Sequence, residues 1–540
     1  YKFYVGEGGL RVPLIIAGEP LNLSDPNSII DAFSYATDIV PTILQLTGVP
    51  QPNGRYNSRE VEPIVGRSMV PLLQGQAERI YGDDDAIGYE LNGHRALFLG
   101  DHKIVYNRPP IGDGIWHLFF QHNTEATTWG NMTWGHAESR DLVHWDQVDH
   151  ALYPDSLGTM FSGSAAVDKY NTAGFGEDAL LAFYTAAGQF VNPQQPYTQC
   201  LAYSLDNGRT WIKYEQNPII DEIEPGNRDP KVIWHEETER WIMALYLSGD
   251  RYCLLSSQDA KSWTHLQDLT LEGDRECPDF FPLKSPSGDE KWVFTGASGN
   301  YLIGEFNGYE FKPQSPLQRF EHGQNGYASQ TWSDAPNNRR IQISWMTGGL
   351  YPEMPFNQQM SIPVELTLTG SSQQLRLSRL PVNELTSLHR KTTTISEGVA
   401  AKGNSFKIQS DATFFDLSFD LIRSEANTLY IVIRGQALTV NWRTNEIKFE
   451  GARANKVVPE RNPMPLPDEE SNSLRLLVDK TSLELFVGDG EISASFCYLP
   501  DAYSDPIVFN CYEGQQLIKN IELHEMKSIW AVLHVLPRLT

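Results

Sequence analysis

The stretch Asn227-Arg228-Asp229-Pro230-Lys231-Val232-Ile233-Trp234 begins with three polar residues and then becomes apolar. A later run, Arg275-Glu276-Cys277-Pro278-Asp279-Phe280-Phe281, repeats this design. Each run places a carboxylate beside an arginine at the start of a predicted buried strand, where burial and the neighbouring charge would set the carboxyl pKa. Two such carboxylates that converge on one axis would form a pair of the kind that cleaves glycosidic bonds.

The turns around these two runs form a repeat. Three Ser-x-Asp turns are each followed by a tryptophan, and an Asn-Gly turn is followed by a phenylalanine. They are Ser139-Arg140-Asp141 before Trp145, Ser204-Leu205-Asp206 before Trp211, Ser257-Gln258-Asp259 before Trp263, and Asn307-Gly308 before Phe311. Each turn follows a predicted strand pair: 117–120 with 135–138, 180–184 with 200–203, 241–247 with 252–255, and 291–295 with 301–306. A fifth pair joins 341–346 with 360–366.

Repetition every roughly 50–65 residues, with about four strands in each unit, is typical of a β-propeller. We therefore predict a mainly β protein with a five-bladed propeller over residues 106–385. An irregular β-sandwich would not explain the recurring turns. The innermost strand of each blade should lie just before its strand pair, so that all innermost strands start at one end of the central channel. This arrangement places Asp229 and Glu276 on adjacent blades.

The rest of the chain differs from the repeat. Residues 395–540 alternate polar and apolar side chains, as in 428–433 and 482–487, which predicts a β-sandwich. This sandwich could be a sugar-binding module or a packing partner of the propeller. Residues 1–105 form a small mixed α/β segment, in which 31–47 has helical spacing with Gly48 as its C-cap and 95–106 predicts two short strands.

Composition narrows the choice of partner and cofactor. The 540 residues include 43 Lys and Arg against 68 Asp and Glu, a net charge of -25. This charge disfavours nucleic acid and anionic membranes and suits a neutral partner, although a solvated acidic surface explains it equally well. The five cysteines are scattered and indicate neither a zinc site nor a disulfide framework, and we expect no metal or other cofactor. We expect no membrane span. We find no signal peptide at Tyr1, but the opening resembles the middle of a domain, so a missing true start is an open alternative. The oligomeric state is also open.

Four runs of the N-terminal segment carry a resemblance of their own. They are Glu7-Gly8-Gly9-Leu10-Arg11-Val12-Pro13, Asp38-Ile39-Val40-Pro41-Thr42-Ile43-Leu44, Gly66-Arg67-Ser68 with Leu72-Leu73, and Arg95-Ala96-Leu97 with Gly100-Asp101-His102-Lys103. This segment resembles the C-terminal part of arylsulfatases, and Lys2 matches a lysine that contacts sulfate in that family. No cysteine lies in the context that those enzymes need for their formylglycine nucleophile. We therefore interpret residues 1–105 as a structural remnant without sulfatase activity.

A second set of motifs covers the chain from about Trp116 onward. It comprises His117-Leu118-Phe119-Phe120-Gln121-His122-Asn123, Trp129-Gly130-Asn131-Met132 with Trp134-Gly135-His136, Phe161-Ser162-Gly163-Ser164, Arg228-Asp229-Pro230, Glu276-Cys277-Pro278, and the run from Met354 to Met360. These motifs resemble glycoside hydrolase family 32, the β-fructosidases (invertase, levanase, inulinase). The resemblance implies a propeller plus sandwich, an oligosaccharide or small sugar as substrate, and a secreted or periplasmic location.

The resemblance also implies roles for individual residues. Glu276 would be the general acid/base, Asp229 would bind the fructosyl hydroxyls and stabilise the transition state, and Arg228 would orient Asp229 and the sugar. Gln121, Trp129, Phe161 and Ser162 would line the pocket. A structural salt bridge between Asp229 and Arg228 is the simpler alternative for that pair.

One motif of the family is missing. The nucleophile is the Asp of a Trp-Met-Asn-Asp-Pro-Asn-Gly motif that opens the first blade, and in an ungapped register Val105 takes its position. Asp113 would lie about 16 Å along the strand from the active end, and Asp101 would lie at the right end but out of register. Three hypotheses follow: a glycosidase of modified mechanism, a non-catalytic sugar-binding protein, or an inactive fusion. The run Gln324-Asn325-Gly326 departs from the family and points to altered specificity.

Overall fold

The computed structural model describes residues 14–17, 29–30, 32–52, 55–56, 59–61, 64–82, 84–91, 94–99, 102–106, 114–332, 335–349, 351, 357–410, 412–424, 426–451, 461, 463–500 and 507–529. The chain forms two compact units, Tyr1–Asp113 and Gly114–Thr540. Lys2, Asp101 and Asp113 lie outside the described residues. No helix of the described part is long and apolar enough to cross a membrane.

The first unit contains the predicted helix and strand pair. Helix α2 (Ile39–Thr47) ends at Gly48, whose φ of 69° is the left-handed conformation of a C-cap, as predicted. The predicted start near residue 31 was wrong, because residues 32–35 are not helical and only a short 3-10 turn, η2 (Ala36–Asp38), precedes α2. The buried Asp38 carboxylate fixes this start, since it accepts hydrogen bonds from the backbone N–H groups of Tyr35 and Arg67.

The strands of the first unit make sheets of their own. The unit also holds α3 (Val70–Leu73) and the short pair β1 (Arg55–Tyr56) and β2 (Arg59–Glu60). The predicted strands at 95–106 are β4 (His94–Leu99) and β5 (His102–Tyr106), which form a three-stranded antiparallel sheet with β3 (Ala86–Leu91). Val105 pairs with Ala96 in this sheet. The register that made Val105 part of the first blade was therefore wrong.

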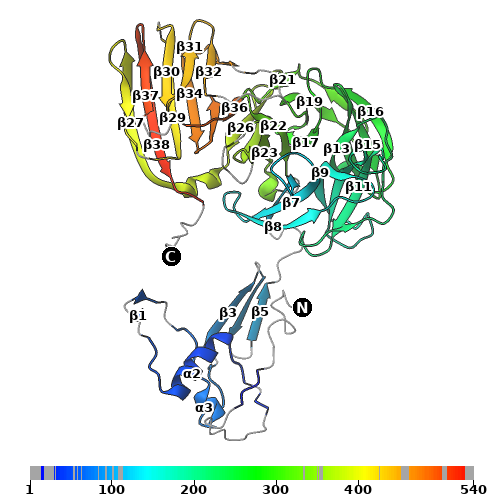
Figure 1. Cartoon of the computed structure of the whole chain (residues 1–540), viewed down its shortest axis with the longest axis vertical. Coiled ribbons are helices and arrows are strands. Elements are labelled where there is room, and N and C mark those ends of the chain that lie inside the picture. The colour runs from blue at the N-terminus through cyan, green and yellow to red at the C-terminus, as the bar shows by residue number, and fades with distance from the viewer. Residues whose placement is uncertain are drawn as a thin grey trace. The chain divides into compact units, whose positions relative to one another are not determined.

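The second unit begins with the five predicted blades (Figure 1). Blade 1 is β6 (Trp116–Asn123), β7 (Met132–Ser139) and β8 (Trp145–Leu152). Blade 2 is β9 (Thr159–Asp168), β10 (Ala179–Ala187), β11 (Tyr197–Ser204) and β12 (Ile212–Lys213). Blade 3 is β13 (Arg228–His235), β14 (Arg240–Ser248), β15 (Arg251–Ser257) and β16 (Thr264–Thr270). The predicted strand pairs of these blades are confirmed.

Blades 4 and 5 complete the set. Blade 4 is β17 (Asp279–Lys284), β18 (Glu290–Thr295), β19 (Asn300–Phe306) and β20 (Phe311–Pro313), with β21 (Gln318–Arg319) also on β19. Blade 5 is β22 (Gly326–Thr331), β23 (Ile341–Met346), β25 (Val364–Thr369) and β26 (Arg376–Pro381), with β24 (Gln359–Met360) also on β23. Blades 2 to 5 each have an innermost strand before the predicted pair. Within the described residues, blade 1 has three strands and β6 is its first.

The recurring turns have a shared hydrogen-bond pattern. In the first three blades the serine hydroxyl lies 2.8–3.2 Å from the aspartate two residues later. The following tryptophan donates its indole N–H to a backbone carbonyl three residues earlier, at 3.0 Å for Trp145, 2.9 Å for Trp211 and 3.2 Å for Trp263. These contacts satisfy the polar groups of a tight turn and bury a large ring beside it, which explains why the same residue types return in blades 1 to 3.

Hydrogen bonds and charges join the innermost strands. Lys231 of β13 lies 3.1 Å from Asp279 of β17 and donates to the backbone oxygen of Thr331 in β22 at 2.6 Å. All three residues are buried, so each charge has its partner inside the propeller. Blade 5 also contacts blade 1, because the Trp332 indole N–H donates to the backbone oxygen of His117 at 2.7 Å.

The C-terminal part is the predicted β-sandwich. One sheet has the order β27 (His389–Ala401), β38 (Gln515–Met526), β29 (Phe415–Ile422), β34 (Ser471–Val478), β35 (Ser482–Val487) and β36 (Ile492–Cys497). The other has the order β28 (Phe406–Ile408), β37 (Ile507–Cys511), β30 (Thr428–Ile433), β31 (Gln436–Asn441), β32 (Glu446–Phe449) and β33 (Met464–Pro465). Side chains alternate between buried and half-buried along β30, as its sequence predicts.

The sandwich packs on the propeller. All six residues of β35 are buried, because one face lies in the sandwich core and the other meets blade 5. Glu484 on that second face accepts a hydrogen bond from the backbone N–H of Ile362 at 2.8 Å. The buried Arg461 donates to the backbone oxygens of Ser298 and Gly326, both at 2.8 Å. Of the two hypotheses for the sandwich, a packing role therefore has direct structural support.

Candidate active site

The predicted site lies where the innermost strands begin, and the backbone there is irregular. The pairing register shifts between Tyr184 and Ala186 in blade 2, between Arg228 and Lys231 in blade 3, and between Tyr327 and Gln330 in blade 5. Several residues at these starts have positive φ without being glycine: Asp229 (65°), Glu276 (54°), Cys277 (39°) and Ala328 (50°). Bulges and left-handed residues redirect side chains out of the pleat and are common at functional sites. The irregular backbone at the strand starts therefore orients these side chains differently from those of a regular strand.

Asp229 is held rigidly at the start of β13. Its side chain is 6% exposed. The backbone N–H of Cys277 donates to Asp229 Oδ2 at 3.1 Å, and the Cys277 thiol lies 3.4 Å from the same oxygen. On the other side, the backbone N–H of Asp229 donates to the Thr185 hydroxyl at 2.9 Å. These bonds tie blade 3 to blades 2 and 4 and leave the carboxylate little freedom.

Glu276 lies on the next blade, in the loop that leads into β17. The Tyr327 hydroxyl donates to Glu276 Oε1 at 3.1 Å, and the Arg275 guanidinium is 3.8 Å from that oxygen. The loop itself is anchored by the buried Asp274, whose carboxylate accepts from the backbone N–H groups of Arg275, Ser298 and Asn300 at 2.7–2.9 Å. The side chain of Glu276 remains 27% exposed, so it can reach a ligand.

Arg228 lies between the two carboxylates. Its Nε is 3.8 Å from Asp229 Oδ2 and its Nη2 is 3.5 Å from Glu276 Oε2. It also donates to the backbone oxygen of Gly226 at 2.6 Å, and its guanidinium lies 4.6 Å from the centre of the Tyr246 ring. The structure thus brings the three residues together. Arg228 lies close to both carboxylates and does not pair with Asp229 alone.

Electrostatics distinguish Asp229 from an ordinary surface carboxyl. Burial raises its pKa to about 6, and the nearby Glu276 acts in the same direction. The Arg228 charge and the hydrogen bonds from Cys277 oppose this rise. Burial is the largest cause, because it removes water from the charged form. Arg228 therefore reduces the penalty of burying Asp229 without cancelling it.

The four predicted pocket residues lie at the same end of blades 1 and 2. Gln121 donates to the Ser162 hydroxyl at 3.4 Å. The Trp129 ring is 6.1 Å from that of Phe161, centre to centre, and 59% of Trp129 is exposed. Phe161 is 5.6 Å from Tyr197, and Tyr197 lies beside Gly226, the residue whose oxygen Arg228 contacts. A chain of contacts therefore links these aromatic rings to Arg228.

Sequence reasoning missed several residues of this arrangement: Thr185, Phe190, Tyr197, Tyr246, Asp274 and Tyr327. Phe190 stacks edge-to-face on Trp129 at 4.9 Å. Tyr327 opens a predicted innermost strand, so its contact with Glu276 could have been anticipated from the repeat. The others lie at the far ends of second and third strands or in loops, where no sequence signal marks a residue as facing the channel mouth.

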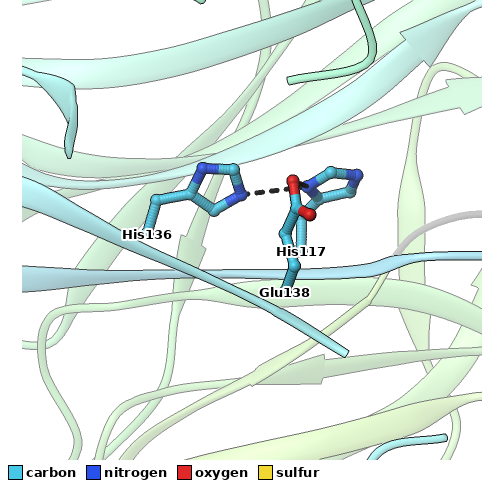
Figure 2. A group of neighbouring side chains, drawn as sticks. All are labelled: His117, His136 and Glu138. Carbon is cyan, nitrogen blue, oxygen red and sulfur yellow. Dashed lines mark hydrogen bonds and ion pairs between the residues drawn. The ribbon is translucent and has the colours of Figure 1, made fainter. Parts of the chain in front are cut away.

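One group of side chains in the described part of the chain has the composition of a metal site, and it lies elsewhere in blade 1. Figure 2 shows His117, His136 and Glu138 together, with a dashed line joining a nitrogen of one imidazole ring to a nitrogen of the other. Nδ1 of His117 is 2.9 Å from Nε2 of His136 and 3.7 Å from Oε1 of Glu138. Burial, with a smaller effect from His117, lowers the pKa of His136 to about 3.

Comparisons with known proteins agree with the fold. The model of the glycosyl hydrolases family 32 N-terminal domain matches residues 106–378, and that of the family's C-terminal domain matches residues 382–525. The arylsulfatase-like segment, residues 1–105, lies outside both ranges, and its resemblance stays a prediction.

Individual relatives point to the same family. A levanase of Bacillus subtilis is 34% identical over 477 residues, which cover 79% of this chain and 69% of the levanase. An extracellular exo-inulinase of Aspergillus niger is 29% identical and covers 77% and 91% of the two chains. Among solved structures, exo-inulinase from Aspergillus awamori has a TM-score of 0.67 at 27% identity, covering 77% of this chain and 94% of that one. A β-fructofuranosidase of Schwanniomyces occidentalis complexed with fructosyl-erythritol has a TM-score of 0.68 at 25% identity, covering 77% and 93%.

Proposed function

The chain belongs to glycosyl hydrolase family 32, and we propose that it binds β-fructosides at the mouth of the propeller channel and hydrolyses them slowly. The observation that carries this proposal is the contact of one arginine, Arg228, with two carboxylates on adjacent blades. The relatives are named as a levanase, exo-inulinases and a β-fructofuranosidase, which favours fructose as the sugar unit that is recognised.

In this proposal the two carboxylates have different tasks. Asp229 is rigid and deeply buried, so it accepts hydrogen bonds from the fructosyl hydroxyls and opposes the positive charge that develops at the anomeric carbon. Glu276 is more exposed, so it can reach the departing glycosidic oxygen and donate a proton to it. The aromatic side chains of Trp129 and Phe161 pack against the apolar face of the sugar.

The attacking group is the unusual part of the mechanism. Blade 1 has no innermost strand within the described residues, and that strand would supply the family's nucleophile. We propose that a water molecule attacks the anomeric carbon directly once Glu276 has protonated the leaving group. The anomeric carbon of a fructoside is fully substituted and supports positive charge well, so this route needs no covalent intermediate. Loss of a nucleophile commonly lowers the rate by several orders of magnitude. We therefore expect slow turnover.

The first blade, which has three strands within the described residues, also favours a second candidate function. A chain that keeps Arg228, Asp229 and the aromatic residues but lacks a nucleophile would bind fructosides without cleaving them. An inactive fusion would do neither. Hydrolysis and binding must therefore be measured separately.

The test compares wild type with Glu276→Gln, Asp229→Asn and the exposed control Glu236→Gln on sucrose, inulin, levan and a panel of nitrophenyl glycosides. Fructose release and calorimetric binding are measured on the same preparations. Fructose release that both site variants abolish and the control retains supports the enzyme. Binding without release selects the sugar-binding protein, and neither activity selects the inactive fusion. Activity that is unchanged in Glu276→Gln would refute its role as the acid.

The names of the relatives indicate where this protein acts and on what partner. Several exo-inulinases that match this chain are described as extracellular, so we propose that this chain also acts outside the cytoplasm. Its partner would be a fructan or a smaller fructoside rather than another macromolecule.

A further inference from the structure

The group of His117, His136 and Glu138 lies away from the proposed sugar site. His117 is the second residue of β6, whereas Gln121 of the pocket is four residues further along the same strand, about 13 Å at the rise of a β-strand. His117 pairs with Glu138 across the β6–β7 ladder, and Gln121 pairs with Trp134. The group therefore lies toward the opposite end of the blade, and the hydrolysis of fructosides does not explain it.

We propose that His117, His136 and Glu138 bind one zinc ion that joins the first two strands of blade 1. The strand register brings the three side chains to one face of the sheet, because His136 and Glu138 are two residues apart on β7 and His117 is the cross-strand partner of Glu138. Figure 2 shows the resulting arrangement, with the carboxylate of Glu138 beside the His117 ring.

The distances fit a tetrahedral ion after small side-chain movements. Zinc holds histidine nitrogens and carboxylate oxygens at about 2.0–2.2 Å, so two ligand atoms on one tetrahedral ion lie about 3.3 Å apart. The distances from His117 Nδ1 to the other two ligand atoms are 2.9 Å and 3.7 Å, and the three atoms lie within 4.8 Å of one another. Two imidazoles and one carboxylate are a donor set that zinc prefers over calcium or magnesium.

The surroundings suit a structural ion. His136 is 1% exposed, which fixes its ring, whereas His117 and Glu138 keep 16% and 24% of their side chains exposed, so a water molecule can provide the fourth ligand. Gly208 of blade 2 lies against His117, and a Cβ at that position would be 3.1 Å from His117 Cε1. The ion would thus stabilise the blade that has three strands within the described residues, next to its contact with blade 2.

The chain offers a matched control on the same blade. Nδ1 of His122 lies 2.7 Å from Nε2 of His150, and the two rings are stacked with centres 5.0 Å apart. This pair joins β6 to β8. Among the described residues, no third metal-binding side chain lies close enough to form a group of three with it, as Glu138 does with His117 and His136. If a histidine pair alone were sufficient for zinc, both pairs would bind it.

The experiment uses the full chain without a histidine tag, freed of metal with a chelator and then titrated with ZnCl2 by calorimetry and with CoCl2 by visible absorption. We expect one ion per chain, a tetrahedral cobalt spectrum and a higher thermal unfolding midpoint with zinc. Glu138→Gln should weaken zinc binding at least tenfold and His136→Gln should abolish it, whereas His150→Gln should leave it unchanged.

Two results would overturn the proposal. One is folded wild type, judged by circular dichroism, that shows no saturable binding of either metal. The other is zinc binding that survives in both Glu138→Gln and His136→Gln or is lost in His150→Gln. Because Glu138 is partly exposed and glutamine has its shape, Glu138→Gln keeps the test decisive if His136→Gln fails to fold. Neither result depends on whether the chain cleaves fructosides.

Discussion

Replacing Asp229 with asparagine should make the protein more stable at neutral pH while it removes the function of the site. Burial raises the pKa of this carboxyl from its ordinary 3.8 to about 6. The folded state therefore holds the proton more tightly than the unfolded state does. The stability that the protonated group contributes is fully present below pH 3.8 and is lost as the pH rises through 6.

The magnitude follows from the size of the shift. A difference of about 2 pH units corresponds to about 3 kcal/mol at 1.36 kcal/mol per unit. Asparagine has no charge to bury, and its oxygen can still accept the hydrogen bond from the backbone N–H of Cys277. The free energy of unfolding of Asp229→Asn, relative to wild type, should therefore rise by most of this amount, about 2 kcal/mol, between pH 4 and pH 7. Contributions that do not depend on pH cancel in this comparison.

The assay is differential scanning calorimetry of wild type, Asp229→Asn and the exposed control Asp221→Asn at pH 4 and pH 7. The midpoint difference between Asp229→Asn and wild type should grow by a few degrees from the lower to the higher pH, and that of the control should not. If Asp229→Asn loses stability relative to wild type as the pH rises, attraction to Arg228 outweighs burial. The assignment of Asp229 as a costly functional carboxylate would then be wrong.

Three further predictions concern the contact between sandwich and propeller, one residue with a left-handed backbone, and one exposed aromatic side chain of the predicted pocket. Burial raises the pKa of Glu484 to about 8, so the stability from its protonated form is present below pH 4.5 and is lost as the pH approaches 8. The Glu484→Gln variant should remove this loss of stability, which is on the order of 3–5 kcal/mol. Thermal unfolding at pH 5 and pH 9 measures it. Ala328 has a φ of 50°, so Ala328→Gly should raise the free energy of unfolding by about 1 kcal/mol, whereas Ala165→Gly within β9 should lower it. Trp129 is 59% exposed, so Trp129→Ala should leave the melting temperature unchanged and weaken fructoside binding about tenfold, whereas Trp129→Phe should retain most of it.

Much of the architecture could be predicted because it repeats. Each Ser-x-Asp turn has the same internal hydrogen bonds and the same indole contact, so one residue pattern marks the same place in each of the first three blades. The positions of Asp229 and Glu276 followed from that repeat. Their contact with a shared arginine was not predicted from the repeat, because it depends on bulges and positive φ values at the strand starts.

The failures have physical causes as well. The register that assigned Val105 to blade 1 relied on counting back from His117 without gaps, but β5 pairs with β4 instead. The alternation in 482–487 predicted a strand of the sandwich but not what covers its polar face, and both faces of β35 are buried because blade 5 covers the second one. Local pattern shows which side chains share a face of a strand, and only tertiary packing decides what covers that face.

The most direct test of the proposed chemistry is chemical rescue of wild type. If the chain has an acid and a fructosyl site but no protein nucleophile, a small external nucleophile should replace the slow attack by water. With sucrose as substrate, added azide should attack the anomeric carbon while Glu276 protonates the departing glucose. Glucose release should then increase with azide concentration, fructosyl azide should accumulate, and both effects should disappear in Glu276→Gln. Sucrose that remains uncleaved by wild type both with and without azide would contradict the proposal that this site is catalytic.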